Sequence, residues 1–271
     1  MFAARILTAA ALLAAFVAAA LFLERAAFAV VAGAIVACAA REWAALARLR
    51  GRKALAYAAG CTALYGVIAA WAWPVSPGGM PMRIILFGAL AFWAAVVPLW
   101  LAGGMQPRHG FLPAAGIAAL VPAGLAMVAL HPGALLAILG LVWISDTAAY
   151  GVGRSFGRRK LAPTVSPGKT LEGAAGAILA SLAYAVILAL WMPAIGAHLR
   201  GFAWVAYAAG ATLLCVSGIL GDLFESGAKR QAGVKDSGTL LPGHGGVLDR
   251  IDSACAALPV GAFMLSWAGT A

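Results

Sequence analysis

Long apolar runs separated by short polar segments make up most of this chain. Most of the runs approach the ~20 residues that an α-helix needs to cross a bilayer. The pattern therefore predicts an all-α fold, that of a polytopic integral membrane protein with about nine transmembrane helices. Eight is the alternative, because the second and the last runs are short. The runs lie at about 6–23, 26–40, 54–73, 84–102, 111–130, 133–150, 173–192, 202–220 and 254–270.

Composition supports a membrane protein and excludes an ordinary soluble enzyme. Of the 271 residues, 64% are hydrophobic and 10% are charged, and the mean hydropathy is +0.96. A chain of this composition cannot cover its surface with polar groups, so most of that surface is expected to face lipid. We expect one transmembrane domain over residues 1–271 and no separate soluble domain. The first run also resembles a signal peptide with a cleavage site at 27–29, but in a multispanning chain we expect it to be retained.

The charge distribution predicts how the chain lies in the membrane. Its net charge is +10 and its pI is about 10. The bases form no surface interleaved with aromatic residues, so we expect no nucleic-acid partner. Basic residues at membrane ends set topology and meet anionic lipids. With nine spans, 16 of the 19 bases lie on the side of the N-terminus, which predicts that this end and both strongly charged loops are cytoplasmic. The basic segment at 41–53 is interpreted as a solvated, interfacial helix end.

The first charged stretch, residues 146–172, combines an acid with a group of bases. Asp146 ends an apolar helix, and an ionisable residue at membrane depth is a functional candidate because its burial is costly. The arginine and lysine side chains that follow it in the sequence are suited to bind phosphate, arginine through paired N–H donors and lysine through its ammonium group. A turn is predicted at 166–170, where Gly-Lys-Thr resembles the end of a P-loop. That motif needs glycine at position 163, where this chain has Pro163, so we reject it. A basic loop that only sets topology remains the alternative.

The second charged stretch, residues 222–253, holds five of the nine acids and four of the bases. Asp222, Ser226 and Lys229 are spaced i, i+4 and i+7, so one helix face presents a carboxylate, a hydroxyl and an ammonium group. A glycine-rich loop follows at residues 242–246, and its glycines let the backbone approach a ligand closely. A further pair of aspartates, at 249 and 252, then starts the last helix. Carboxylates from two helix ends with bases between them predict a site for phosphates and a hard divalent cation such as magnesium.

The second stretch also carries a recognisable motif. The string SGAKRx4KDxGx2LPxHGGVxDRID, at residues 226–252, resembles the C-terminal signature of the phosphatidate cytidylyltransferases, also called CDP-diacylglycerol synthases. Residues 146–172 resemble the loop that precedes this signature in that family. The length and multispanning layout agree over essentially the whole chain. One departure is Ala228, where the family usually has a larger apolar residue; it bears on local packing and not on the polar chemistry.

The resemblance implies a reaction, its cofactors and its setting. The reaction is transfer of a cytidylyl group from CTP to phosphatidic acid, which yields CDP-diacylglycerol and pyrophosphate. Mg²⁺ would be required, and K⁺ shares the site in relatives. The resemblance also implies a homodimeric, multi-pass protein of the bacterial inner membrane. Matched by motif position, Asp222 and Asp249 would be the metal ligands, with Asp146 and Asp252 as second candidates.

The candidate residues follow from the chemistry of this reaction. The lipid phosphate is already anionic at neutral pH, so catalysis needs no strong protein base and depends on positioning and charge neutralisation. Which bases hold CTP and which hold the lipid phosphate stays open, as does whether the loop histidine donates to pyrophosphate or orders the loop. The candidate catalytic residues are Asp222, Lys229, Arg230, Lys235, Asp236, His244, Asp249 and Arg250. The candidate substrate-binding residues are Asp146, Arg154, Ser166, Lys169, Ser226, Gly245, Gly246 and Asp252.

Other CTP-using membrane enzymes remain alternatives, namely polyprenol or phytol kinases and cytidylyltransferases for ether lipids. Kinases would leave a lipid phosphate and CDP, whereas the KRx4KD and HGGVxDR strings favour a CDP-lipid product. The DGx2AR pattern of CDP-alcohol phosphotransferases is absent. An ion transporter would carry its charges at mid-span in broken helices, but these acids stand at helix ends beside a glycine loop. A structural scaffold would need neither charged stretch.

Overall fold

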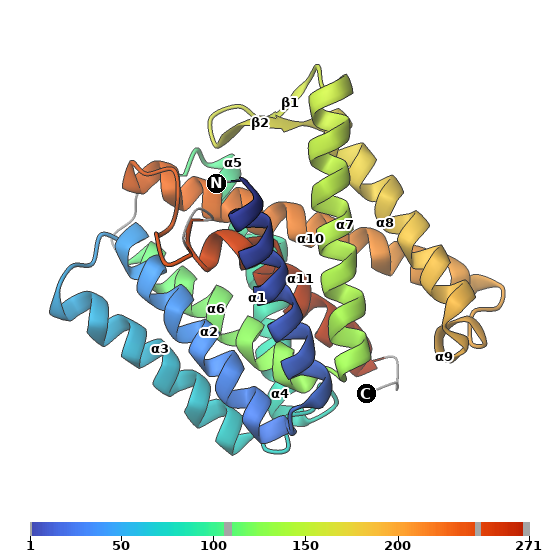
Figure 1. The fold of residues 1–271 in the computed structure, drawn as a ribbon, viewed down its shortest axis with the longest axis horizontal. Coiled ribbons are helices and arrows are strands. Elements are labelled where there is room, and N and C mark those ends of the chain that lie inside the picture. The colour runs from blue at the N-terminus through green and yellow to red at the C-terminus, as the bar shows by residue number, and fades with distance from the viewer. Residues whose placement is uncertain (1, 106–109, 242–244, 268–271) are drawn as a thin grey trace.

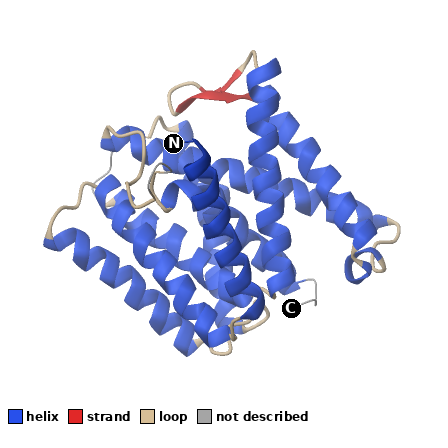
Figure 2. Ribbon diagram, viewed as in Figure 1, coloured by secondary structure: helices blue, strands red, loops and turns tan. Residues whose placement is uncertain are grey.

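The structure is a computed structural model that describes residues 2–105, 110–241 and 245–267. Within these ranges the chain is mostly helical, and its strands form one two-stranded sheet (Figure 2). The helices are α1 (Phe2–Phe22), α2 (Arg25–Leu46), α3 (Arg52–Trp71), α4 (Met80–Ala91), α5 (Val97–Ala102), α6 (Phe111–Ala129), α7 (Pro132–Phe156), α8 (Leu171–Trp191), α9 (Pro193–Gly196), α10 (Phe202–Ala232) and α11 (Leu248–Trp267). A π-helical segment, η1 (Phe92–Val96), joins α4 to α5, and the strands are β1 (Lys160–Ala162) and β2 (Ser166–Thr170).

The helices coincide with the apolar runs of the sequence. Eight of the nine runs each fall on one helix, and the run at 84–102 falls on the consecutive segments α4, η1 and α5. Within the described ranges, seven helical segments are long and apolar enough to cross a membrane. The prediction of an all-α, polytopic membrane protein is therefore confirmed.

Local sequence explains where the helices that carry the site begin and end. Pro132 occupies the first turn of α7, where a missing N–H does no harm, and His131 Nδ1 accepts from Gly133 N at 3.2 Å. Thr170 caps α8, because its Oγ1 accepts from Gly173 N at 3.1 Å. At the other end of the site, α10 stops at Gly233, whose φ of 77° is left-handed and favours glycine.

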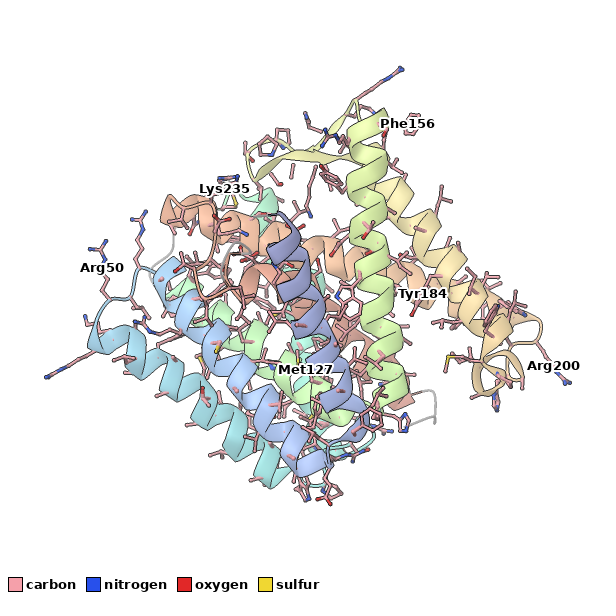
Figure 3. All side chains as sticks on the ribbon, viewed as in Figure 1. Arg50, Met127, Phe156, Tyr184, Arg200 and Lys235 are labelled. Carbon is pink, nitrogen blue, oxygen red and sulfur yellow. The ribbon has the colours of Figure 1, made fainter. Side chains whose placement is uncertain are left out.

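The packing of the long helices brings the two charged stretches of the sequence to the same side of the molecule. α7 packs on α8, α10 on α11, and α2 on both α3 and α6. The β1–β2 hairpin lies at one end of α7, and α11 ends on the opposite side of the molecule (Figure 1). Figure 3 shows Lys235 and Phe156 toward the hairpin side and Arg200 far from them. The two charged stretches of the sequence therefore meet on one side of the helix bundle.

An aromatic cluster holds α10 in place. Phe224 of α10 is 1% exposed, and four aromatic rings from α2, η1 and α5 surround it. The ring centroids of Trp43, Phe92, Trp93 and Trp100 lie 5.2–5.6 Å from that of Phe224. Aromatic pairs at this spacing contribute about 0.5–1.5 kcal/mol each beyond the area that they bury. This packing fixes the rotation of α10 and so the direction of its polar face.

The predicted turn at 166–170 is wrong. These residues form strand β2, which pairs antiparallel with β1 and places Lys160 opposite Thr170 and Ala162 opposite Ser166. The turn lies at 163–165 instead, where Val165 N donates to Ala162 O at 3.2 Å. Pro163 explains the shift, because it lacks an N–H for the ladder and fits the connection between the strands.

The interpretation of 41–53 as a solvated helix end is also wrong for its first half. α2 continues to Leu46, and Glu42, Trp43 and Leu46 are buried. Trp43 Nε1 donates to Leu112 O at 2.7 Å, which ties this turn to α6. Arg41 and Ala45 are exposed on the other face of this helix end, and the turn that leads to α3 is largely exposed as well. The physical reason is that other parts of the chain cover this end of α2, which periodicity within the segment does not reveal.

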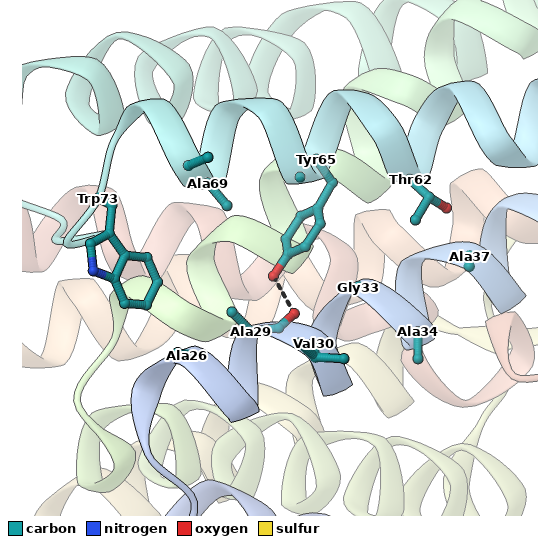
Figure 4. A pocket seen from close by; sticks show the side chains of 12 residues that line it. Ala26, Ala29, Val30, Gly33, Ala34, Ala37, Thr62, Tyr65, Ala69 and Trp73 are labelled. Atoms are coloured by element: carbon teal, nitrogen blue, oxygen red, sulfur yellow. Dashed lines mark hydrogen bonds between the residues drawn. The ribbon is translucent and has the colours of Figure 1, made fainter.

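A groove runs between α2 and α3 (Figure 4). It has a volume of about 780 Å³, and its lining of twelve residues is mostly alanine and glycine, with no charged side chain. Tyr65 crosses the groove and its hydroxyl donates to Ala29 O at 2.8 Å. An apolar groove of this kind suits hydrocarbon and not phosphate, so it is separate from the charged region.

Candidate functional site

A buried ion-pair network joins α10 to α11. Lys229 Nζ lies 2.8 Å from Glu225 Oε2 and 2.8 Å from Asp249 Oδ1. The side chains of Lys229, Glu225 and Asp249 are 14%, 2% and 7% exposed. Charges so far from solvent attract strongly, and each becomes costly if its partner is lost. Glu225 and Lys229 are four residues apart on α10, the spacing at which side chains on one helix face meet.

Asp249 also organises the glycine-rich loop. Its Oδ2 accepts from Gly246 N at 2.8 Å and from Ser237 N at 3.0 Å, so it binds the chain on both sides of the loop. Burial opposes ionisation of this carboxyl, but the hydrogen bonds from Lys229, Gly246 and Ser237 outweigh it and lower the pKa of Asp249 below its usual value. Asp249 is therefore held as an anion that faces several donors.

The β1–β2 hairpin brings the first charged stretch to the second. Lys169, on β2, forms an ion pair with Asp222 Oδ2, and Ser226 Oγ donates to Asp222 Oδ1 at 3.2 Å. Arg230 Nε donates to Val165 O at 3.3 Å, which holds the turn of the hairpin against α10. The face of Asp222 and Ser226 predicted from helical spacing is present. Lys169 approaches it from another part of the fold.

Two further carboxylates lie near Asp222. Asp146 of α7 interacts electrostatically with Asp222 and Lys169. Asp252 of α11 interacts with Asp222 and Glu225, and its Oδ1 accepts from Ser253 N at 2.7 Å. Carboxylates from α7, α10 and α11 therefore interact with one another, and Lys169 interacts with two of them, Asp146 and Asp222. Within the described ranges, no group of three or more His, Cys, Asp or Glu side chains is arranged to hold a metal ion.

Other predicted residues lie at the edge of this cluster or away from it. Lys235, Asp236 and Arg250 are exposed. Arg154 is exposed as well, and it donates to the Tyr150 hydroxyl at 2.7 Å instead of pointing to the carboxylates. Ser166 is half-buried on β2. The predicted His244 lies outside the described residues.

The two described glycines of the loop have distinct reasons to be glycine. Gly245 has a φ of 81°, which side chains rarely adopt. At Gly246 an added Cβ would lie 2.2 Å from Ser237 Oγ and 2.4 Å from Glu42 Oε2. Both residues therefore shape the loop, and Gly246 marks a close approach of the loop to α2.

Sequence reasoning missed Glu42. It is 8% exposed, and it accepts hydrogen bonds from Ser237, Val247 and Leu248. Its position among bases suggested a surface charge. A usable signal was present, since Glu42 is the one acid between Glu24 and Asp146 in the sequence.

Comparison with known proteins decides the family. A sequence model described as the cytidylyltransferase family matches residues 3–268. The chain belongs to the cytidylyltransferase family. A phosphatidate cytidylyltransferase of Pseudomonas aeruginosa is 41% identical over 263 residues, which cover 91% of this chain and 90% of that protein. Two proteins of the same name match over shorter segments. The one from Haemophilus influenzae is 48% identical over 128 residues, which cover 46% of this chain and 43% of that protein. The one from Staphylococcus epidermidis is 45% identical over 120 residues, which cover 44% of each chain.

The geometry suits the chemistry of the cytidylyltransferase family. Arginine and lysine side chains bind phosphates, and grouped carboxylates attract a hard cation that bridges to phosphate oxygens. Both kinds of group lie within the α10–α11 network and the adjoining hairpin. The resemblance noted from residues 226–252 is therefore confirmed at the level of the family, and the roles of single residues remain predictions.

Proposed function

We propose that this chain transfers a cytidylyl group from CTP to phosphatidic acid and forms CDP-diacylglycerol and pyrophosphate for phospholipid biosynthesis. The observation that carries the proposal is the similarity to the Pseudomonas aeruginosa phosphatidate cytidylyltransferase over 91% of this chain. The meeting of the hairpin with the α10–α11 network supports it, because it gathers bases and carboxylates from both charged stretches. The seven helical segments of the described ranges that are long and apolar enough to cross a membrane fit an enzyme whose lipid substrate resides in a membrane.

In the proposed reaction an oxygen of the lipid phosphate attacks the α-phosphorus of CTP. A new P–O bond forms, the bond from the α-phosphorus to the bridging oxygen breaks, and pyrophosphate leaves with the electron pair. The protein's task is to bring two anionic phosphates together and to neutralise the charge on the leaving group. Lys169 and Lys229 lie within the carboxylate cluster and Arg230 at the hairpin. The outer cations, Lys235 and Arg250, are placed to reach phosphates from solvent.

We further propose that the reaction requires Mg²⁺ as a cofactor and that K⁺ binds beside it. Asp222 and Asp249 would hold Mg²⁺, with Asp146 and Asp252 as second candidates. Mg²⁺ usually takes one or two carboxylates and fills its other positions with water and substrate phosphates, so a cage of three ligands is not required. The buried Glu225 carboxyl supports a cation nearby, because it interacts with two further acids, Asp249 and Asp252. When bound, the metal would neutralise charge on the reacting phosphates.

Each proposed metal ligand is paired with a lysine. Lys169 pairs with Asp222, and Lys229 pairs with Asp249. Ammonium groups at these places compensate the negative charge of the two carboxylates. The same lysines are close enough to the carboxylates to contact a phosphate that arrives with the metal. This arrangement supports the proposal that Lys169 and Lys229 bind phosphate.

The cellular setting is also proposed. We infer that the chain is a multi-pass protein of a bacterial inner membrane, with the N-terminus and the site facing the cytoplasm, where CTP is available. The excess of bases on that side supports the orientation. A homodimer remains part of the proposal and can be measured by mass photometry or cross-linking in detergent.

The test separates the proposed transferase from a lipid kinase by the position of the label. Purified, detergent-solubilised protein is incubated with magnesium, phosphatidic acid or a polyprenol, and CTP labelled at either the α- or the γ-phosphate. The proposal predicts that α-label enters CDP-diacylglycerol and that γ-label leaves in pyrophosphate. Transfer of the γ-label to a polyprenol, with no α-label in lipid, would show a kinase instead.

A further inference from the structure

Glu42 reaches the site from the other end of the sequence. Its Oε1 accepts from Val247 N at 3.0 Å, and its Oε2 accepts from Leu248 N at 2.8 Å and from Ser237 Oγ at 3.1 Å. These donors come from two segments, one on each side of the glycine-rich loop. One carboxylate thus fastens both ends of the loop to α2.

The charge of Glu42 suits this place. Val247 and Leu248 are at the start of α11, where backbone N–H groups have no partner within the helix and the helix dipole favours an anion. Glu42 supplies that anion from a helix far away in the sequence. Because Glu42 accepts from these N–H groups, Asp249 in the first turn of α11 is not needed to cap them. Its oxygens accept from Lys229, Gly246 and Ser237 instead.

Two glycines make room for the Glu42 carboxylate. An added Cβ at Gly238 would lie 2.6 Å from Glu42 Oε1, and one at Gly246 would lie 2.4 Å from Glu42 Oε2. These distances are too short for a real Cβ. The backbone on both sides of the loop therefore closes around this carboxylate, and a side chain at either glycine would displace it.

The neighbour of Glu42 fixes its direction. Trp43 stacks on Phe224 of α10 with ring centroids 5.2 Å apart, and its Nε1 donates to Leu112 O. The last turns of α2 are therefore held against α10 and α6. Glu42 faces the loop because its helix cannot rotate, so the carboxylate is preorganised for its three donors.

We propose that Glu42 is a positioning residue for cytidylyl transfer, which sets Asp249 and the segments that flank the glycine-rich loop at the spacing that the nucleotide with its magnesium requires. It touches neither substrate nor metal and acts through Ser237, Val247 and Leu248. The inference rests on the proposed function, because it assigns the loop to the nucleotide side of the reaction.

The expected effect is on the nucleotide and the metal more than on the lipid. Glu42→Gln keeps the size of the side chain but replaces an accepting oxygen with an amide NH₂, which cannot accept from these donors. Loss of a partner that orients a metal ligand typically lowers metal affinity or activity about 10–100-fold. We expect the KM for CTP and the half-saturating magnesium concentration each to rise about 10-fold, while the KM for phosphatidic acid stays within about two-fold.

The experiment compares Glu42→Gln with a matched control. Glu24→Gln makes the same change at the exposed start of α2, and we expect it to leave all constants unchanged. Ser237→Ala removes one donor while Glu42 stays, so it should raise the KM for CTP by a smaller factor, about three-fold. Ser237→Ala also decides the matter if Glu42→Gln fails to fold. Thermal unfolding of each detergent-solubilised variant accompanies the kinetics.

Two outcomes would overturn the inference. One is that folded Glu42→Gln and Ser237→Ala keep the wild-type KM for CTP and the wild-type magnesium dependence. The other is that kcat falls together with thermal stability while each KM stays unchanged, which is the mark of a purely structural role. A wild-type protein that makes no CDP-diacylglycerol would instead refute the proposed function, so the two failures are distinguishable.

Discussion

Lys229 of α10 and Asp249 of α11 form a 2.8 Å ion pair that holds the two helices of the site together. The pair is shared, because Lys229 also binds Glu225 and Asp249 also binds the backbone of the loop. A single ammonium group thus compensates two buried carboxylates. The network is therefore sensitive to substitutions that remove a charge and keep the shape of the side chain.

Removal of the Lys229 charge should destabilise the protein. Lys229→Met keeps the length of the side chain and leaves Glu225 and Asp249 without their cation. Because breaking a buried pair leaves an uncompensated charge, we expect a loss of about 3–5 kcal/mol. Lys53→Met, at an exposed position, should change stability by no more than about 0.5 kcal/mol. Chemical denaturation in detergent measures both, and equal stability of the two variants would refute the network.

The contribution of Asp249 to stability should depend on pH. Its pKa is lowered in the folded protein, so its contribution is fully present above the unfolded pKa of about 3.9 and is lost as pH falls through the folded pKa. The stability difference between wild type and Asp249→Asn should therefore be larger at about pH 6 than below about pH 4. A difference that grows toward acid would contradict the lowered pKa.

Loss of the hairpin contact should reduce activity without unfolding the protein. Lys169 and Asp222 are each about one quarter exposed, so their pair adds little stability. Lys169→Met should lower kcat/KM about 100-fold, because Lys169 is the cation that the hairpin brings to the carboxylates. Lys160→Met, on the exposed strand β1, is the matched control and should stay near the wild-type rate. Similar activity in both variants would remove Lys169 from the site.

The space around Gly246 and Gly151 predicts opposite effects of an added methyl group on stability. Gly246→Ala places a Cβ against Ser237 and Glu42, and we expect it to destabilise by about 1–3 kcal/mol and to impair catalysis. At Gly151 on α7 an added Cβ meets nothing within 4 Å, so Gly151→Ala should be neutral or stabilising by up to about 1 kcal/mol. Denaturation midpoints compare the two directly.

The sequence predicted the features that depend on neighbouring residues. Apolar run length indicated the helices, because a bilayer selects for it. Helical spacing placed Asp222, Ser226 and Lys229 on one face, and the structure connects Asp222 with Ser226 and Lys229 with Glu225. These relationships span one or two turns and need no knowledge of packing.

Contacts between distant segments could not be predicted in the same way. Glu42 and Leu248 are 206 positions apart, and their hydrogen bond depends on how Trp43 packs against Phe224. The strand at 166–170 was likewise missed, because its pairing with β1 depends on a turn at Pro163 and not on alternating hydrophobicity. Tertiary packing decides such contacts, and one sequence carries only weak traces of it.

The central claim is that the α10–α11 site catalyses magnesium-dependent cytidylyl transfer to phosphatidic acid. The most direct measurement is the formation of CDP-diacylglycerol from CTP and phosphatidic acid by the purified protein, with and without magnesium, beside Asp249→Asn and the control Glu24→Gln. We predict product only with magnesium, near-wild-type product from Glu24→Gln, and none from folded Asp249→Asn. An intact wild-type protein that forms no CDP-diacylglycerol, or a folded Asp249→Asn that forms it at the wild-type rate, would contradict the account.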